Sequence, residues 1–336
     1  PERAVMLAYS KIWLYDELLA SSLPDDPWVA TALVRYFPGA LEKSYATYMT
    51  RHPLKREIIA THVTNSMVNR VGSTFVHRLA ETTGARPHEV VRAYLLSREV
   101  FGLVPLWMAI EALDNKVDDA VQSTMLIDTS AQLERGTTWF LRSRRLGDDI
   151  GTTIAHFAPG VAELSERLPK LLDTGERSRI DAAVARYVAQ GVPQELAVRV
   201  VTFDTLYASL DIAEVAASAK RPVEPVAAIY FDLGNKLGLS WLRERIAALP
   251  GDKHWQLLSR SAMQDDLSGL QRTLAGTVLA NHDADGISPA KRVAVWQDAN
   301  KRALERATQL LAELRAVPAP DAAMLSVALR ELRSLA

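Results

Sequence analysis

The sequence predicts an all-α protein, an irregular bundle of many helices with an internal duplication of a helical unit. Three observations lead to this fold class. Apolar residues recur at spacings of three and four along nearly the whole chain, and the alternation typical of strands is hard to find. Prolines and glycines stand where helices should begin and end. A pattern of six residues occurs twice with a constant offset.

Prolines mark the expected helix starts, because the first turn of a helix tolerates them. They follow Asp26, His52, Ala158, Val192, Arg221 and Ser288. Glycines mark the expected helix ends, because glycine readily adopts the left-handed conformation that often closes a helix. These are Gly84, Gly147, Gly175, Gly191 and Gly251. Two helices are expected to be long, at about 117–145 and 252–281.

The first expected helix, over residues 2–20, is apolar on most sides, which is typical of a buried helix. Lys11, Tyr15 and Asp16 lie on it. We expect Lys11 to snorkel or to form an ion pair, and not to act as a nucleophile. Pro1 stands at a first helical position without a capping residue before it, so we expect the chain to be cut from a longer one.

The repeated pattern predicts a duplicated unit of three or more helices. Tyr94, Gly102, Leu103, Leu106, Ile110 and Leu113 match Tyr230, Gly238, Leu239, Leu242, Ile246 and Leu249 at an offset of 136 residues. The alternative is that two helical hairpins share Gly-Leu turns and leucine spacing by chance. We expect N-terminal helices over 1–52, a first helical unit over 53–150, a second over 151–285 and C-terminal helices over 286–336, all in one compact domain.

One expected helix, over residues 65–80, has a polar side of unusual composition. On a helical projection its polar side chains gather opposite the apolar ones, and they are Asn65, Ser66, Asn69, Arg70, Ser73 and His77. A solvated face usually carries Lys and Glu, whereas amides, hydroxyls and one Arg suit an interface in which hydrogen bonds are placed. We therefore predict that this polar stripe faces another domain or subunit. The alternative is an ordinary solvated face.

Composition limits the possible functions. Of the 336 residues, 48% are hydrophobic and 24% charged, which is normal for a globular protein with a sizeable core. The net charge of −1 gives no electrostatic support for binding nucleic acid or an anionic membrane. No apolar run approaches the roughly 20 residues of a membrane span. Cysteine is absent, which excludes disulfides and thiol catalysis and suits the cytoplasm.

The search for catalytic motifs finds none. A dinucleotide site needs G-x-G-x-x-G between a strand and a helix, and the sequence has neither that spacing nor the strand. The seven histidines form no metal-binding pair of the H-E-x-x-H or E-x-x-H type. Acidic pairs at 25–26, 118–119 and 148–149 precede expected helices, where carboxylates interact favourably with the helix dipole. We expect no catalytic, cofactor-binding or metal-binding residue in this chain.

Several longer segments carry a resemblance to a known family. They include LAYSKIWLYDELLASSLPDDP, REIIATHVTNSMVNRVGSTFVHRLAE, YFDLGNKLGLSWLRERIAALP and MLSVALRELRSLA. From Pro1 to Ala336 the chain resembles the C-terminal part of the large bacterial NAD-specific glutamate dehydrogenases. Pro105 departs from the family, which usually continues there with helix formers, but a proline is acceptable in a first turn.

The resemblance implies a helical domain that follows a catalytic domain with a dinucleotide fold. The family converts L-glutamate, NAD and water reversibly to 2-oxoglutarate, ammonium and NADH. The resemblance also implies that the full-length enzyme uses NAD and that this segment binds no cofactor. It further implies a cytoplasmic homo-oligomer, with the enzyme's own catalytic domain and other subunits as partners, and neither nucleic acid nor membrane.

Three roles for the chain stay open. It is a structural, assembly or regulatory region without catalytic residues of its own, which we take as the main hypothesis. Alternatively, it closes over the glutamate site and completes it, with Arg70 binding a substrate carboxylate. The third possibility is a stand-alone helical scaffold or peptide-binding module.

Overall fold

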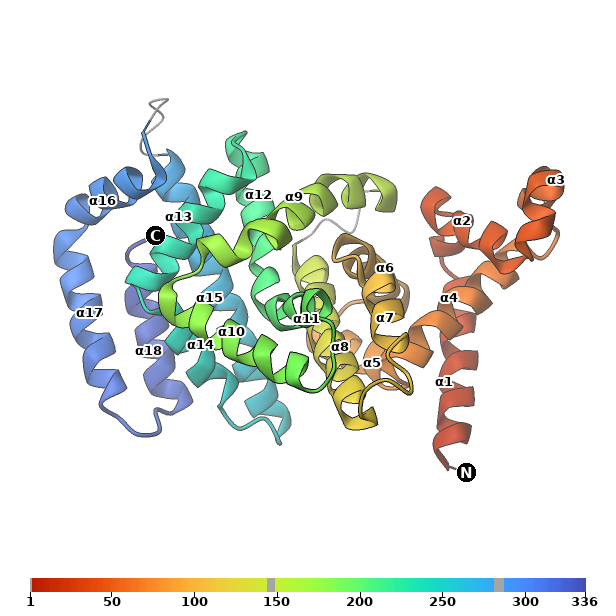
Figure 1. The fold of residues 1–336 in the computed structure, drawn as a ribbon, viewed down its shortest axis with the longest axis horizontal. Helices are drawn as coiled ribbons and strands as arrows, with labels where there is room; N and C mark the ends of the chain where they lie inside the picture. The colour runs from red at the N-terminus through yellow and green to blue at the C-terminus, as the bar shows by residue number, and fades with distance from the viewer. Residues whose placement is uncertain (1, 144–148, 281–286) are drawn as a thin grey trace. The chain divides into compact units, whose positions relative to one another are not determined.

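The computed structural model describes residues 2–143, 149–280 and 287–336, and within these ranges the protein is all-α, as predicted (Figure 1). A short 3-10 helix spans Leu23–Asp25. The α-helices are α1 (Glu2–Leu19), α2 (Pro27–Tyr36), α3 (Gly39–Thr50), α4 (Lys55–Val71), α5 (Phe75–Thr83), α6 (Pro87–Val100), α7 (Leu103–Glu111), α8 (Asp119–Arg142), α9 (Ile150–Leu171), α10 (Thr174–Ala189), α11 (Gln194–Leu206), α12 (Ala208–Ala219), α13 (Val223–Lys236), α14 (Leu239–Ala247), α15 (His254–Ala280), α16 (Pro289–Ala299), α17 (Lys301–Arg315) and α18 (Ala322–Arg333).

Contacts divide the chain into two compact units. Unit 1 comprises Pro1–Pro159 and Val184–Asp204, and unit 2 comprises Gly160–Ala183 and Thr205–Ala336. This division groups the residues differently from the four segments expected from the sequence. Whether those segments are separate folding parts stays a prediction.

The core of unit 1 forms around α6 and the long α8, which pack closely against each other (Figure 1). Gly136 of α8 permits this approach, because a Cβ atom there would lie 2.8 Å from the ring of Phe101 and closer still to the Ser97 hydroxyl.

No single described helix is long and apolar enough to cross a membrane, whereas α6 and α7 together, bent by 71°, have the length and composition of a broken span. Their apolar residues, such as Val90 and Leu96, lie buried in the core of unit 1.

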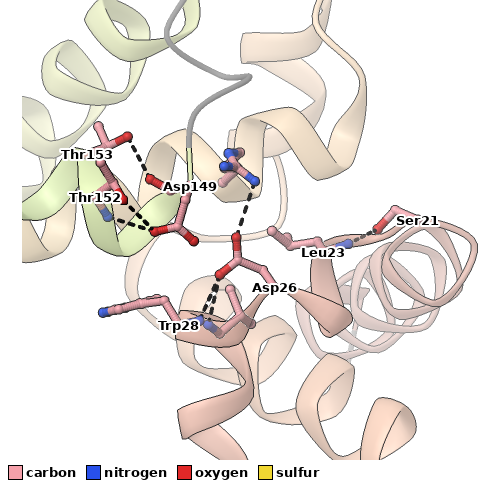
Figure 2. A network of polar contacts seen from close by, with 9 residues as sticks. Ser21, Leu23, Asp26, Trp28, Asp149, Thr152 and Thr153 are labelled. Carbon is pink, nitrogen blue, oxygen red and sulfur yellow. Dashed lines mark hydrogen bonds and ion pairs between the residues drawn. The ribbon is translucent and has the colours of Figure 1, made fainter.

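Two aspartates in unit 1 cap helices at their N-termini (Figure 2). Asp26 accepts hydrogen bonds from the backbone N–H groups of Trp28 (2.9 Å) and Val29 (3.3 Å) at the start of α2, and it pairs with Arg92 of α6 at 3.5 Å. Asp149 accepts from Thr152 at the start of α9, at 2.8 Å from the backbone N–H. Hydrogen bonds from Thr152 are also the main reason that the pKa of Asp149 lies below its usual value. Each capping carboxylate accepts hydrogen bonds from backbone N–H groups that have no partner within the first turn of the helix.

The internal duplication is confirmed by the positions of three consecutive helices in each copy. Helices α6 and α7 recur as α13 and α14, and every start and end is displaced by 136 residues. The ends of α5 and α12 obey the same offset. Gly102 and Gly238 join the second helix to the third, and both are left-handed, with φ of 59° and 64°. We call 75–142 the first copy and 211–280 the second copy.

The matched residues also occupy matched environments. All the paired Tyr, Leu and Ile side chains are buried, from the fully buried Ile110 and Ile246 to Leu113 and Leu249, which are 6% and 9% exposed. A long helix follows in each copy, α8 in the first and α15 in the second, as expected. Shared Gly-Leu turns alone would not fix element ends and burial together, so the two segments are one helical unit repeated.

Two of the expected helix boundaries are wrong, and Gly147 lies outside the described residues. Pro159 does not begin a helix but lies within α9, which starts after the Asp149 cap and continues because Phe157 and Val161 are both buried. Gly175 does not end a helix but is the second residue of α10. Asp173 starts that helix by accepting a hydrogen bond from the Glu176 N–H at 2.7 Å. In both cases a carboxylate cap outweighs the proline or glycine signal.

Candidate functional site

The predicted polar stripe is divided between two helices of unit 1. The prediction of one continuous helix over 65–80 is wrong, because α4 ends at Val71 and Gly72 turns the chain with φ of 82°. Asn65, Ser66, Asn69 and Arg70 lie on α4, Ser73 lies in the connection, and His77 lies on α5. The stripe residues are half-buried or exposed, so they remain at the surface of the unit.

Arg70 is held by two side chains of α7. Its guanidinium lies 4.7 Å from the centre of the Trp107 ring and 2.5 Å from the Glu111 carboxylate. Trp107 is itself fixed, because it is buried and its indole N–H donates to the Thr129 hydroxyl of α8 at 3.1 Å. A cation over an indole ring and an ion pair on the same guanidinium restrict its orientation strongly. Arg70 therefore joins α4 to α7.

His77 stacks on an aromatic residue of the first helix. Its ring lies 4.0 Å from that of Trp13, with an angle of 19° between the two planes. The two helices α1 and α5 thus meet through their rings, and His77 remains exposed at the edge of the contact. The imidazole nitrogens are consequently available at the surface for a hydrogen bond.

Ser66 lies near a buried tyrosine of α6. Burial raises the pKa of the Tyr94 hydroxyl, while the charges of Arg98 and Arg70 and the nearness of Ser66 oppose the rise. Among the described residues no group forms a hydrogen bond with this hydroxyl, although Tyr94 is fully buried. Phe75 packs edge-on against the Tyr94 ring, with 6.2 Å between ring centres. Ser66 thus lies between the surface of unit 1 and the buried Tyr94.

A further histidine of α4 lies in a basic environment. Burial lowers the pKa of His62, and the charges of Arg98 and Arg35 lower it further. Position 62 precedes Ser66 and Arg70 by steps of four, so the three residues share one face of α4. His62 on this face therefore lies beside the positive charges of Arg98 on α6 and Arg35 on α2.

The second copy places the matching tyrosine in a different polar network. The Tyr230 hydroxyl donates to Asp211 at 3.2 Å, and Asp211 pairs with Arg272 of α15 at 2.8 Å. Burial and the charge of Asp211 raise the pKa of Tyr230 well above its usual value. Asp211 stands 136 residues after Phe75, so a carboxylate in one copy replaces a phenyl ring in the other.

The N-terminal helices of unit 1 expose many large apolar side chains. Only Leu14 and Leu18 of α1 are buried, so the expectation of a largely buried helix is wrong. The exposed side chains on α1 and α3, which we call the N-terminal apolar surface, are Val5, Met6, Leu7, Tyr9, Ile12, Leu41, Tyr45 and Tyr48. The first half of α1 extends beyond the helices against which its second half packs (Figure 1).

The side chains around the stripe are suited to hydrogen bonding and not to acid–base chemistry. They offer a guanidinium, an imidazole, hydroxyls and amides, but Arg70 and Glu111 neutralise each other. In residues 2–143, 149–280 and 287–336 no three His, Asp or Glu side chains gather where they could hold a metal ion. Whether the stripe contacts another domain or subunit stays a prediction.

Sequence reasoning missed the partners of the stripe and the N-terminal apolar surface. Trp107 and Glu111 are four residues apart on α7, a spacing that places both on one face and could have indicated a shared contact. Nothing local in the sequence connects them to Arg70. The tyrosines Tyr45 and Tyr48 stand beside Lys and Glu on α3, a mixture that could have indicated an exposed aromatic face.

Comparison with known proteins places the chain in one group of sequences. The family model described as "Glutamate dehydrogenase, C-terminal" matches residues 1–334. The chain is 39% identical to an NAD-specific glutamate dehydrogenase of Pseudomonas aeruginosa, 37% to one of Halomonas elongata and 34% to one of Mycobacterium tuberculosis. In each case the match covers 100% of this chain but only 20% or 21% of the relative. The chain thus spans about a fifth of the length of the curated relatives it matches.

Proposed function

Because the chain belongs to the family formed by the C-terminal region of glutamate dehydrogenases, we propose that it is a structural and assembly region of an NAD-specific enzyme. In this proposal the whole enzyme oxidises L-glutamate to 2-oxoglutarate and ammonium with NAD as the hydride acceptor. The dinucleotide and the catalytic groups belong to polypeptide outside residues 1–336. This chain provides surfaces for that polypeptide and for other subunits.

The exposed apolar side chains of α1 and α3 are the observation on which this role rests. Tyr9 and Tyr48 are 69% and 74% exposed, and Ile12 is 58% exposed. Single exposed apolar residues are common, but several on each of two helices indicate that these helices contact other polypeptide. Aromatic residues are enriched in the cores of protein interfaces. Coverage of this surface by other polypeptide would stabilise the assembly by removing apolar area from water.

The polar stripe supports the same role in a secondary way. Asn69 and His77 are exposed beside Arg70, whose charge is already paired within the chain. A surface of amides, an imidazole and a neutralised arginine can hydrogen-bond to a protein partner at a small desolvation cost. For Arg70 to bind a substrate carboxylate, its guanidinium would have to share its donors with Glu111 or release it. The structural role therefore fits the observed contacts better.

The proposal is tested first with the isolated chain of 336 residues. Calorimetric titration with NAD should show no binding, and incubation with glutamate and NAD should produce no NADH. Coenzyme binding with a Kd below the millimolar range would overturn the proposal. Tm measured by calorimetry in the same samples reports whether the chain is folded.

A second experiment changes the N-terminal apolar surface in the full-length enzyme. Tyr9→Ser combined with Tyr48→Ser should lower the Tm or dissociate the assembly, as measured by analytical ultracentrifugation. The matched control is Met324→Ser on α18, an apolar side chain of unit 2 that is 43% exposed. Wild-type assembly and Tm for the double variant would refute a role of this surface in assembly.

A further inference from the structure

The two copies of the helical unit differ in what lies over their third helices. The outer face of α14 in the second copy carries Ser240, Trp241 and Glu244. At the offset of 136 residues these positions are Val104, Pro105 and Met108 on α7. Three polar or amphipathic residues in one copy thus correspond to three apolar residues in the other. The contacts of the two faces explain the difference.

In the second copy, α10 lies over one side of this face. The Ser240 hydroxyl donates to the Glu176 carboxylate at 2.9 Å, and Arg179 pairs with Glu244 at 2.7 Å. Glu176 and Arg179 are on the part of α10 that belongs to unit 2. Two side chains of α10 in the same polypeptide therefore make polar contacts with α14.

The C-terminal end of α17 lies over the rest of the face. The Arg315 guanidinium is 5.4 Å from the centre of the Trp241 ring. Arg315 also packs on the turn between α13 and α14, so closely that a Cβ atom on Gly238 would collide with it. Arg315 thus contacts both the turn and Trp241 in the second copy, whereas the Glu244 side chain keeps 50% of its surface exposed.

In the first copy the same face is open. Val104, Pro105 and Met108 are exposed, and Met108 has 64% of its surface accessible. Gly102 occupies the place of Gly238, yet within the described ranges no atom lies within 4 Å of the position of its Cβ. A face that is polar and contacted by side chains of α10 and α17 in the second copy is therefore apolar and exposed here.

We propose that the face formed by Gly102, Val104, Pro105 and Met108 is covered by a helix from the dehydrogenase polypeptide outside residues 1–336. This inference rests on the proposed function. In the second copy the covering helices come from the same chain. The curated relatives are about five times as long as this chain, so most of the family's polypeptide lies outside the matched region.

The chemistry of the face specifies the kind of helix that fits it. The second copy presents Glu244 and is met by an arginine, whereas the first presents Met108 in its place. The occupant should therefore have an apolar ridge and not a basic one. Its edge would meet Glu111, whose charge Arg70 already balances. Methionine adapts well to such a contact because its side chain is flexible and polarisable.

Photochemical cross-linking in the full-length dehydrogenase tests the inference. A benzophenone amino acid replaces Met108 in one sample and the equivalent Glu244 in another, and adducts are mapped by mass spectrometry. Both side chains are at the surface, so the replacements should leave the fold intact. Mixing subunits of different isotopic composition distinguishes adducts within one polypeptide from adducts between copies.

Position 108 should give adducts with a segment outside residues 1–336 of the same polypeptide. Position 244 should give adducts with residues 174–183 of α10. Adducts from position 108 that lie within 1–336 or on a second copy, or the absence of adducts, would overturn the inference. The absence of adducts between position 244 and α10 would also overturn the inference, because the second copy would then no longer show a contacted face for comparison. None of these outcomes affects the proposed function, which fails instead if the isolated chain binds NAD.

Discussion

Tyr94 and Tyr230 occupy equivalent positions 136 residues apart, but only the Tyr230 hydroxyl forms a hydrogen bond within the described residues. The Tyr230 hydroxyl donates to Asp211 at 3.2 Å. The Tyr94 hydroxyl, although buried, has no hydrogen-bond partner in the part of the chain that the structure describes. An unsatisfied buried hydroxyl costs free energy, whereas a satisfied one contributes to stability. The pair therefore allows one substitution to be compared in two copies.

Tyr94→Phe should leave the free energy of unfolding unchanged or increase it slightly, because it removes a buried polar group without a partner. Tyr230→Phe should decrease it by about 1–2 kcal/mol, because Asp211 loses a donor in a buried site. Urea denaturation of both variants, followed by circular dichroism, measures the difference. Equal destabilisation of the two variants would contradict the assignment of their hydroxyl groups.

The packing of α8 on α6 predicts a strong effect at one glycine. Gly136→Ala should lower the free energy of unfolding by about 1–3 kcal/mol, because the added methyl group would collide with Ser97 and Phe101. The control is Gly269→Ala on α15, where the described structure has no atom within 4 Å of the Cβ position. That variant should gain up to about 1 kcal/mol from helix propensity. A neutral Gly136→Ala would show that α6 and α8 are less closely packed.

Arg70→Ala should destabilise the chain by about 0.5–1.5 kcal/mol, since it removes both the contact with Trp107 and the pair with Glu111. Arg70→Lys keeps the charge but loses the planar contact, so it should recover only part of this. A double-mutant cycle with Glu111→Gln, by denaturant unfolding, isolates the ion pair. The exposed Arg330→Ala is the control and should change little.

The same substitution bears on the predicted interface. In the full-length enzyme, Arg70→Ala should alter oligomeric state, Tm or activity if the polar stripe faces a partner. A wild-type result in all three would show that the stripe is solvated. Arg70→Lys with a raised KM for glutamate and an unchanged Tm would favour completion of the substrate site instead.

The pKa of His62 predicts how stability changes with pH. Its pKa in the folded chain is below the ordinary value of 6.5, so the unfolded state binds a proton more readily. The contribution of His62 is fully present above about pH 6.5 and is lost as the pH falls through the lower folded pKa. His62→Gln should therefore flatten the decline in Tm on acidification below neutral pH. Thr61→Ser, at an exposed neighbouring position, should leave the decline unchanged.

Local sequence signals predicted most of the helices but not their contacts. The caps Asp26 and Ser288 and the left-handed Gly84 and Gly191 act within one turn, so they could be identified without tertiary information. Gly72 could not be recognised as a helix end from the sequence, because the apolar spacing continues on both sides of it while the backbone turns away. A single glycine within a helical pattern is compatible with continuation and with a break.

The contacts of the candidate site depend on packing between distant helices. The spacing of Ser66 and Arg70 predicted a shared polar face, but not that Arg70 would meet Trp107 of α7. The apolar composition of α1 predicted burial, whereas the surroundings that would bury Tyr9 are missing from residues 2–143, 149–280 and 287–336. Periodicity shows which residues share a face and cannot show what that face meets.

The offset of 136 residues holds from the end of α5 to the end of α7, and it leaves no room for an insertion or loss between the two copies over this stretch. Lys220 adopts the left-handed conformation that Gly84 has in the other copy, so even a strained backbone position has kept its shape after its residue changed. Segments 75–111 and 211–247 could accordingly be exchanged as cassettes without a change in chain length. In such a chimaera the surroundings of each copy, and not its own helices, would decide which side chains are tolerated.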